Sequence, residues 1–168
     1  MSGSDKDTAA QALQQRPDLE LRRWQSQALL DLLRIRHASE RRVEELLAHE
    51  RLDVTPAQAN VLMILIALRQ PMTARQLASD MEVSEVTVGR FLKALEGRGW
   101  VSRERNPEDA RAILVSPTTK ARRALPRFLR VSNAMLDVAF SGFDKTAMRD
   151  VARAIGQVRD NIRDPQPR

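Results

Sequence analysis

The side chains best suited to binding chemistry lie between Arg75 and Arg111, where basic and hydroxyl residues alternate with apolar positions. Arg90 and Lys93 occupy the side of an amphipathic segment opposite its apolar residues. A guanidinium group donates two parallel hydrogen bonds to guanine or to phosphate oxygens. This pattern indicates binding to nucleic acid. We find no nucleophile with a base, no phosphate loop and no paired carboxylates in the sequence, so we do not expect an enzyme.

Two short helices separated by a turn are predicted to carry these side chains. Thr73 and Gln76 form a capping box, so a helix should start there and end near Asp80. Ser84 is the N-cap candidate of a second helix, which Gly97 and Gly99 end. The connector of about three residues between the helices is typical of a helix-turn-helix.

The second helix is predicted to have one buried face and one exposed face. Its inward face consists of four apolar residues at helical spacing: Val88, Phe91, Leu92 and Leu95. Its outward face consists of Glu85, Val86, Gly89, Arg90 and Lys93. Groups that can contact base edges are therefore expected to point away from the core.

A two-stranded β wing is predicted after the helices. Residues 100–103 and 112–115 have strand composition, and the loop 104–111 contains an Asn-Pro-Glu-Asp turn. Residues 52–116 are therefore predicted to form a winged helix-turn-helix in a mainly α protein. Nine basic and three acidic residues lie between positions 98 and 130, a surplus as large as the net charge of +6 of the whole chain. The wing and the segment after it thus carry the charge that nucleic acid attracts.

Long helices are predicted on both sides of this domain, and residues 1–17 are predicted to be a disordered tail. Residues 18–50 carry an apolar stripe too long to bury against one small winged domain, so a second copy of the chain is inferred to cover it. Residues 117–163 should form two further helices of the same dimer interface, with a kink or break at Pro126. A helix that starts at Thr55 with a capping box should be the buried centre.

Composition excludes several classes of protein. The chain has no Cys, so disulfides and Cys-based metal sites are impossible. With no Tyr and only four Phe it has few platforms for stacking on single-stranded nucleic acid. The longest apolar run, residues 61–68, is too short to cross a bilayer, and the N-terminus lacks a signal-peptide pattern. A cytoplasmic protein without cofactors and without membrane contact is expected.

The ordered set of motifs resembles the MarR family of bacterial winged-helix regulators. The resemblance covers about residues 30–130 and is carried by five segments: 52–59 (LDVTPAQA), 72–78 (MTARQLA), 83–90 (VSEVTVGR), 95–101 (LEGRGWV) and 109–111 (DAR). It implies a homodimer with intertwined terminal helices, in which the second helix enters a major groove of double-stranded DNA and the wing enters the adjacent minor groove. It also implies that a small ligand binds between the dimer helices and the winged domain and weakens DNA binding, which is the behaviour of a repressor relieved by its effector.

Position by position, the resemblance places the recognition helix at residues 84–96 and the wing pair at Asp109 and Arg111, where the arginine enters the minor groove and the aspartate braces it. The sequence departs from the family at Gly89, which is commonly Thr, and at Ala110, which is often Arg. Both departures favour an alternative function, a winged-helix module that binds another protein and reads DNA weakly or not at all.

The predicted DNA-binding residues follow from residue type, position and resemblance. They are Arg75, Ser84, Glu85, Thr87, Arg90, Lys93, Arg98, Arg103, Arg105, Asp109 and Arg111. Ser84 is expected to cap the helix first, and Glu85 to complement the helix dipole or accept from cytosine. Arg75, Arg98, Arg103 and Arg105 are candidates for phosphate contacts, which position a protein without specifying sequence.

Two smaller expectations concern ligands. Trp24, Met63 and Met135 are candidates to line an effector pocket, although a Met or Trp on a helix stripe is more commonly core. His37 and His49 are twelve residues apart, which does not match the spacing of a helical metal site, so no metal is expected.

Overall fold

The computed structural model describes residues 18–107 and 112–165. The chain divides into two compact units, residues 1–41 and 42–168, and the boundary falls inside helix α2 (Leu19–His49). The predicted tail at residues 1–17 and the predicted wing pair Asp109 and Arg111 lie outside the described residues. In the first unit, none of the residues 18–41 is buried, although the segment is apolar at regular intervals.

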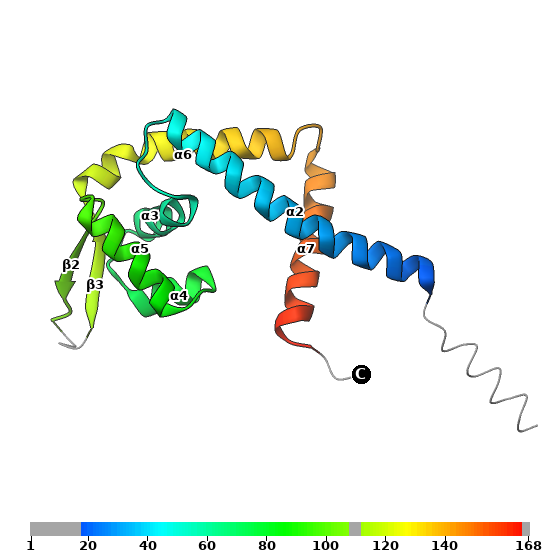
Figure 1. Cartoon of the computed structure of the whole chain (residues 1–168), viewed down its shortest axis with the longest axis horizontal. Coiled ribbons are helices and arrows are strands. Elements are labelled where there is room, and N and C mark those ends of the chain that lie inside the picture. Colours follow the sequence, from blue (N-terminus) through cyan, green and yellow to red (C-terminus); the bar gives the residue numbers. More distant parts are fainter. Residues whose placement is uncertain (1–17, 108–111, 166–168) are drawn as a thin grey trace, which may run out of the picture. The chain divides into compact units, whose positions relative to one another are not determined.

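Helix α3 (Pro56–Leu68) lies at the centre of the second unit's core (Figure 1). Thr55 accepts the Gln58 backbone N–H at 3.3 Å, and the Gln58 side chain accepts the Thr55 N–H at 3.1 Å, which confirms the predicted capping box. Val61, Leu62 and Leu65 are fully buried. The apolar sequence of this segment is therefore explained by contact on several sides.

The helix-turn-helix consists of α4 (Ala74–Met81) and α5 (Glu85–Gly97), each within one residue of its predicted start and end. The capping box at Thr73 is confirmed, since its hydroxyl accepts the Gln76 N–H at 3.2 Å. Glu82 ends α4 in the left-handed conformation at φ 54° and donates its backbone N–H to the last turn of the helix. This sharp turn leaves only three residues, 82–84, between α4 and α5.

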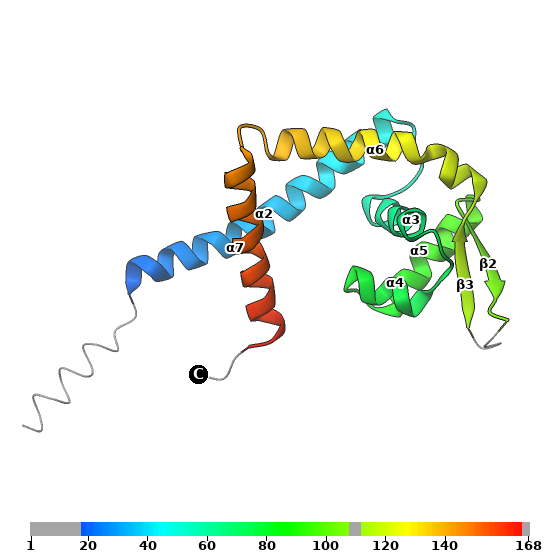
Figure 2. The same cartoon turned by 180° about the vertical axis from the view of Figure 1, so that it is seen from behind.

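The wing is a hairpin of β2 (Val101–Arg105) and β3 (Ile113–Pro117), as Figure 2 shows from behind. Val101 pairs with Pro117 and Arg105 with Ile113 in the antiparallel register. A third strand, β1 (Met72–Thr73), pairs with the other edge of β3, so the two-stranded prediction was incomplete. Two residues are too few to show a strand pattern, and Thr73 also caps α4.

Helices α6 (Thr119–Ala139) and α7 (Lys145–Arg163) complete the second unit. A kink or a break was predicted at Pro126, and the break does not occur, because α6 continues through Pro126 as one helix. Pro126 is exposed, so the carbonyl that loses its N–H partner lies on the solvent side. The buried residues of α6 lie in its first two-thirds: Ala121, Ala124, Phe128 and Val131. Helix α7 buries none of its residues in this chain.

Candidate nucleic-acid interface

Helix α5 separates a buried face from an exposed basic face. Val88 and Leu95 are 0% exposed and Leu92 is 2% exposed, so these three residues fix the inward side. Arg90 and Lys93 are exposed on the opposite side, at the spacing of one helical turn. Neither cation forms an ion pair with another described residue. Both are therefore available to a partner outside the chain.

The start of α5 is held by a hydroxyl pair. Ser84 Oγ accepts the Thr87 backbone N–H at 3.2 Å and lies 2.8 Å from the Thr87 hydroxyl. Ser84 is thus an N-cap, as expected, and Thr87 is half-buried against it. Glu85 is exposed in the first turn, where a carboxylate complements the positive end of the helix dipole.

Gly89 lies inside α5 without a packing reason. A Cβ added at this position would meet no atom of the protein within 4 Å. Its backbone is not in the left-handed region that favours glycine. Glycine inside a helix costs about 1 kcal/mol relative to alanine. The fold of the chain therefore does not explain this residue.

Arg75 and Arg105 are exposed at two edges of the winged helix. Arg75 is the second residue of α4, and Arg105 is the last residue of β2. Neither side chain forms a hydrogen bond or ion pair with another described residue. They remain candidates for phosphate contacts.

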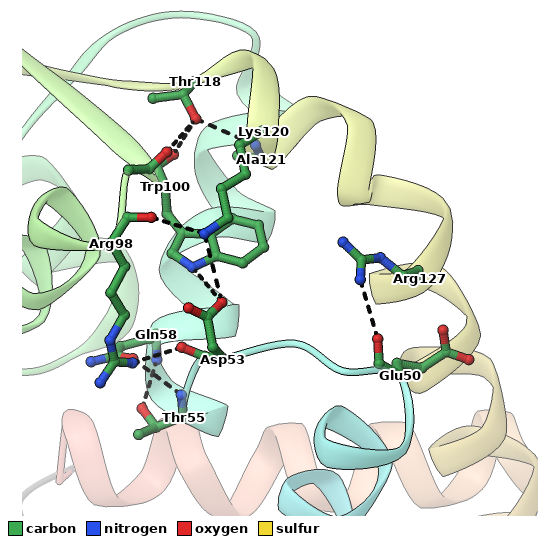
Figure 3. A network of polar contacts seen from close by, with 11 residues as sticks. Glu50, Asp53, Thr55, Gln58, Arg98, Trp100, Thr118, Lys120, Ala121 and Arg127 are labelled. Carbon is green, nitrogen blue, oxygen red and sulfur yellow. Dashed lines mark hydrogen bonds and ion pairs between the residues drawn. The ribbon is translucent and has the colours of Figure 1, made fainter.

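Arg98 and Arg103 have partners within the protein. Arg98 Nη1 donates to the Asp53 carbonyl at 2.6 Å (Figure 3). Arg103 Nε lies 3.2 Å from a Glu96 carboxylate oxygen, and the Arg103 side chain is only 28% exposed. This ion pair joins strand β2 to the last turn of α5. Both arginines are among the predicted phosphate contacts, and within the chain both connect elements of the winged helix.

A buried tryptophan lies at the base of the wing, directly before strand β2. Trp100 is 1% exposed and donates from Nε1 to Asp53 Oδ1 at 2.9 Å. Lys120 Nζ lies 4.1 Å from the centre of the Trp100 ring and donates to the Arg98 carbonyl at 2.8 Å. Thr118 donates its hydroxyl to the Gly99 carbonyl at 2.8 Å. These contacts tie together the α2–α3 loop, the start of β2 and the start of α6 (Figure 3). The sequence pattern did not reveal this network, because its members are distant along the chain.

A second ionic contact joins the end of α2 to α6. Arg130 donates two hydrogen bonds to the Glu50 carboxylate, at 2.9 and 2.7 Å, and Arg127 donates to the Glu50 carbonyl at 3.3 Å. The Glu50 side chain is only 17% exposed. The hydrogen bonds from Arg130 lower the pKa of Glu50 below its ordinary value, because they stabilise the charged carboxylate. These contacts connect the residue that follows α2 to the middle of α6.

A cavity of about 220 Å³ lies between the end of α2, α3 and α6. Its lining is largely apolar and includes Met63, Phe128 and Met135, with Asn60 and Ser132 as polar groups. Met63 and Met135, two of the candidates for an effector pocket, both line this cavity. Trp24 was predicted with them, but it lines a different surface hollow, together with Glu20, Arg23 and Gln27.

Within the part of the chain that the structure describes, no three His, Cys, Asp or Glu residues lie close enough together to hold a metal ion. Among the same residues, no helix is both long and apolar enough to span a membrane.

Comparison with known proteins finds a matching family model, curated relatives and solved structures with the same fold. Residues 54–113 match the model of the MarR family. The uncharacterized HTH-type transcriptional regulator YybA of Bacillus subtilis is 26% identical over 87 residues, which is 52% of this chain and 58% of YybA. The matched regions span between 54% and 62% of the length of the curated relatives.

Two solved structures of protein–DNA complexes share the fold. A mutant of MarR from E. coli complexed with operator DNA has a TM-score of 0.69 at 24% identity, over 76% of this chain and 89% of that one. The S. aureus MepR–DNA complex has a TM-score of 0.73 at 20% identity, over 77% of this chain and 94% of that one.

The first prediction concerns the base of the wing. Asp53→Ala leaves the buried Trp100 N–H without an acceptor, so the free energy of unfolding should fall by about 1–3 kcal/mol. Urea denaturation followed by circular dichroism measures this change. The control Asp80→Ala alters an exposed carboxylate of α4 and should cost less than about 0.5 kcal/mol. Equal stability of the Asp53 variant and the wild type would show that the hydrogen bond is dispensable.

The second prediction concerns acid stability. The pKa of Glu50 is lower in the folded chain than in the unfolded chain, where it is about 4.3. The Glu50 carboxylate therefore stabilises the fold above the unfolded pKa, and this stabilisation is lost as pH falls through the folded pKa. Glu50→Gln should therefore weaken the pH dependence of the free energy of unfolding below pH of about 5, measured by urea denaturation.

Arg130→Gln serves as the matched control for that experiment, because it removes the other partner of the pair. It should reduce the pH dependence in the same way, and the double variant should show no additional reduction. Two independent, additive effects would mean that the ion pair is not their source.

Proposed function

We propose that this chain, whose residues 54–113 match the model of the MarR family, is a transcriptional regulator that binds double-stranded DNA. The observation that carries the proposal is the exposed face of α5. Arg90 and Lys93 point away from the core without a partner among the described residues, on the helix that the family uses for recognition. The E. coli MarR and S. aureus MepR complexes that share the fold contain DNA, which supports the same function here.

In the proposed complex, α5 enters the major groove with its first residues toward the base edges. Arg90 contacts a guanine or a phosphate, and Lys93 contacts the backbone further along the helix. Arg75 and Arg105 are exposed and contact phosphates at the two edges. Arg98 and Arg103 hold elements of the winged helix in position, because they have protein partners at 2.6 and 3.2 Å. Asp109 and Arg111 keep the wing-tip role in the minor groove that the resemblance implies.

The protein acts as a homodimer in this proposal. Trp24 and Ile35 of α2 are 66% and 59% exposed, and Ile155 and Ile162 of α7 are 48% and 68% exposed. Each helix therefore displays an apolar face that a second copy of the chain can bury. A twofold dimer places two recognition helices about one turn of DNA, roughly 34 Å, apart and matches a pseudo-palindromic site.

We further propose that the regulator is a repressor and that a small ligand modulates it. The cavity of about 220 Å³ adjoins α3, on which the helix-turn-helix packs, and α6. Its apolar lining with two polar groups suits a small aromatic ligand. Phe128 lines the cavity and also contacts Trp100 at 5.9 Å between ring centres. A ligand that moved Phe128 would thus act on the base of the wing.

The third prediction tests DNA binding. Selection of random duplexes by the purified protein at a stated salt concentration should return a pseudo-palindromic site. Its affinity should fall linearly with salt on logarithmic axes, because neutralised phosphates release counterions. Arg90→Ala should lower affinity for the selected site by about tenfold or more, which corresponds to about 1–3 kcal/mol, in a gel-shift titration.

The control for that titration is Arg149→Ala, since Arg149 is an exposed arginine on the polar side of α7. It should leave the affinity near that of the wild type. If the selection returns no duplex, and the protein instead binds another protein with an affinity that does not depend on salt, the alternative of a winged-helix module that binds another protein is supported.

The fourth prediction tests the dimer. Removal of residues 1–41 should produce a monomer in analytical ultracentrifugation, because it deletes most of the exposed apolar face of α2. The remaining chain should stay folded, since every buried apolar residue of the described chain lies at or after Leu47. Removal of residues 1–17 alone should leave the dimer intact. A dimer after the longer deletion would place the interface elsewhere.

A further inference from the structure

Val86 is an exposed apolar side chain on the proposed recognition helix. It is the second residue of α5 and is 67% exposed, more than any other large apolar residue described between positions 54 and 113. It begins a row that continues with Arg90 and Lys93 at steps of four and three residues. The row thus has an apolar group near the start of the helix and cations further along.

Folding of the chain does not explain this valine. The buried side of α5 is formed by Val88, Leu92 and Leu95, and Val86 lies on the opposite side. A β-branched residue is also a weaker helix former than arginine, lysine or alanine, so an exposed valine does not strengthen the helix. Its contribution is therefore to be sought in what α5 contacts outside the chain.

The chemistry of the major groove leaves one match for such a side chain. The first residues of a recognition helix lie against base edges. Base edges in the major groove carry hydrogen-bond donors and acceptors, and the only apolar group among them is the 5-methyl of thymine. Valine has neither a donor nor an acceptor in its side chain. We therefore propose that Val86 packs against a thymine methyl group and so specifies a T·A pair in each half-site.

The neighbours of Val86 are consistent with this contact. Gly89 follows three residues later and has no side chain, and the space around its missing Cβ is free of protein atoms within 4 Å. A base edge can therefore approach this side of Val86 closely. Thr87, the neighbouring hydroxyl residue, is half-buried and bonded to Ser84. Val86 is thus better placed than Thr87 to face the bases at this end of the helix.

The inference rests on the proposed DNA binding and adds a defined base contact to it. It also predicts an order along the half-site, because Arg90 lies one helical turn beyond Val86. The thymine methyl contact should lie within a few base pairs of the base pair at which Arg90→Ala changes the sequence preference.

The test removes the methyl group from the DNA and the valine from the protein. Each thymine of the selected duplex is replaced in turn by deoxyuridine, which lacks only the 5-methyl, and affinity is measured by gel shift or fluorescence anisotropy. The wild type should lose about fourfold in affinity per methyl removed at one thymine position of the half-site. Val86→Ala should bind the thymine and uracil duplexes at that position equally and keep the wild-type response at all other positions.

Val83→Ala is the matched control, because Val83 is also an exposed valine, at 38%, but lies in the turn before α5. It should retain the full response to deoxyuridine. Unchanged thermal unfolding of Val86→Ala shows that the fold is intact. A wild type that is indifferent to uracil at every position, or a Val86→Ala variant with the wild-type response, overturns the assignment alone. A wild type that binds no duplex overturns the proposed function and the assignment with it.

Discussion

The rest of the winged helix depends on the burial of Trp100. A buried indole N–H needs an acceptor, and Asp53 of the α2–α3 loop supplies it at 2.9 Å. The ring also meets Phe128 of α6 edge-on at 5.9 Å and lies beneath the Lys120 ammonium at 4.1 Å. One side chain at the start of the wing therefore fixes the ends of three elements. The direction of the wing follows from this arrangement, since β2 begins at the next residue.

Helix α5 and the wing are coupled by a second set of contacts. The buried side of α5 consists of Val88, Leu92 and Leu95, and the Glu96–Arg103 ion pair joins the helix's last turn to β2. Strand β3 pairs with β2 on one side and with β1 on the other, so the wing is continuous with the segment that starts α4. The exposed cations are consequently carried by a framework that apolar packing has made rigid. Such a framework lets a few contacts set orientation on a duplex.

Folding and recognition act on opposite sides of α5. The inward residues are explained by burial, whereas Val86, Gly89 and Arg90 have no packing role in the chain. Gly89 even weakens the helix, by about 1 kcal/mol relative to alanine. Residues that local stability disfavours are expected at functional surfaces, because selection for contact with a partner outweighs a small loss of stability. The face that looks least favourable for a helix is thus the one on which the proposed function depends.

The sequence by itself determined the helices, their caps and the winged helix-turn-helix order. Capping boxes at Thr55 and Thr73 and the glycine that ends α5 act over a few residues, so their effect can be read locally. Helical periodicity likewise predicted which face of α5 is exposed, and hence that Arg90 and Lys93 are exposed.

Tertiary structure decided strand β1 and the continuity of α6 through Pro126. Strand β1 forms because β3 lies beside it, and α6 continues because Pro126 is at an exposed position. The same holds for Arg98, Arg103 and Arg130: local sequence shows that they are cations, but only the fold brings Asp53, Glu96 and Glu50 within reach of them. Charge is a property of a residue, whereas its partner is a property of the fold, because the partner is set by chain segments that are distant in sequence.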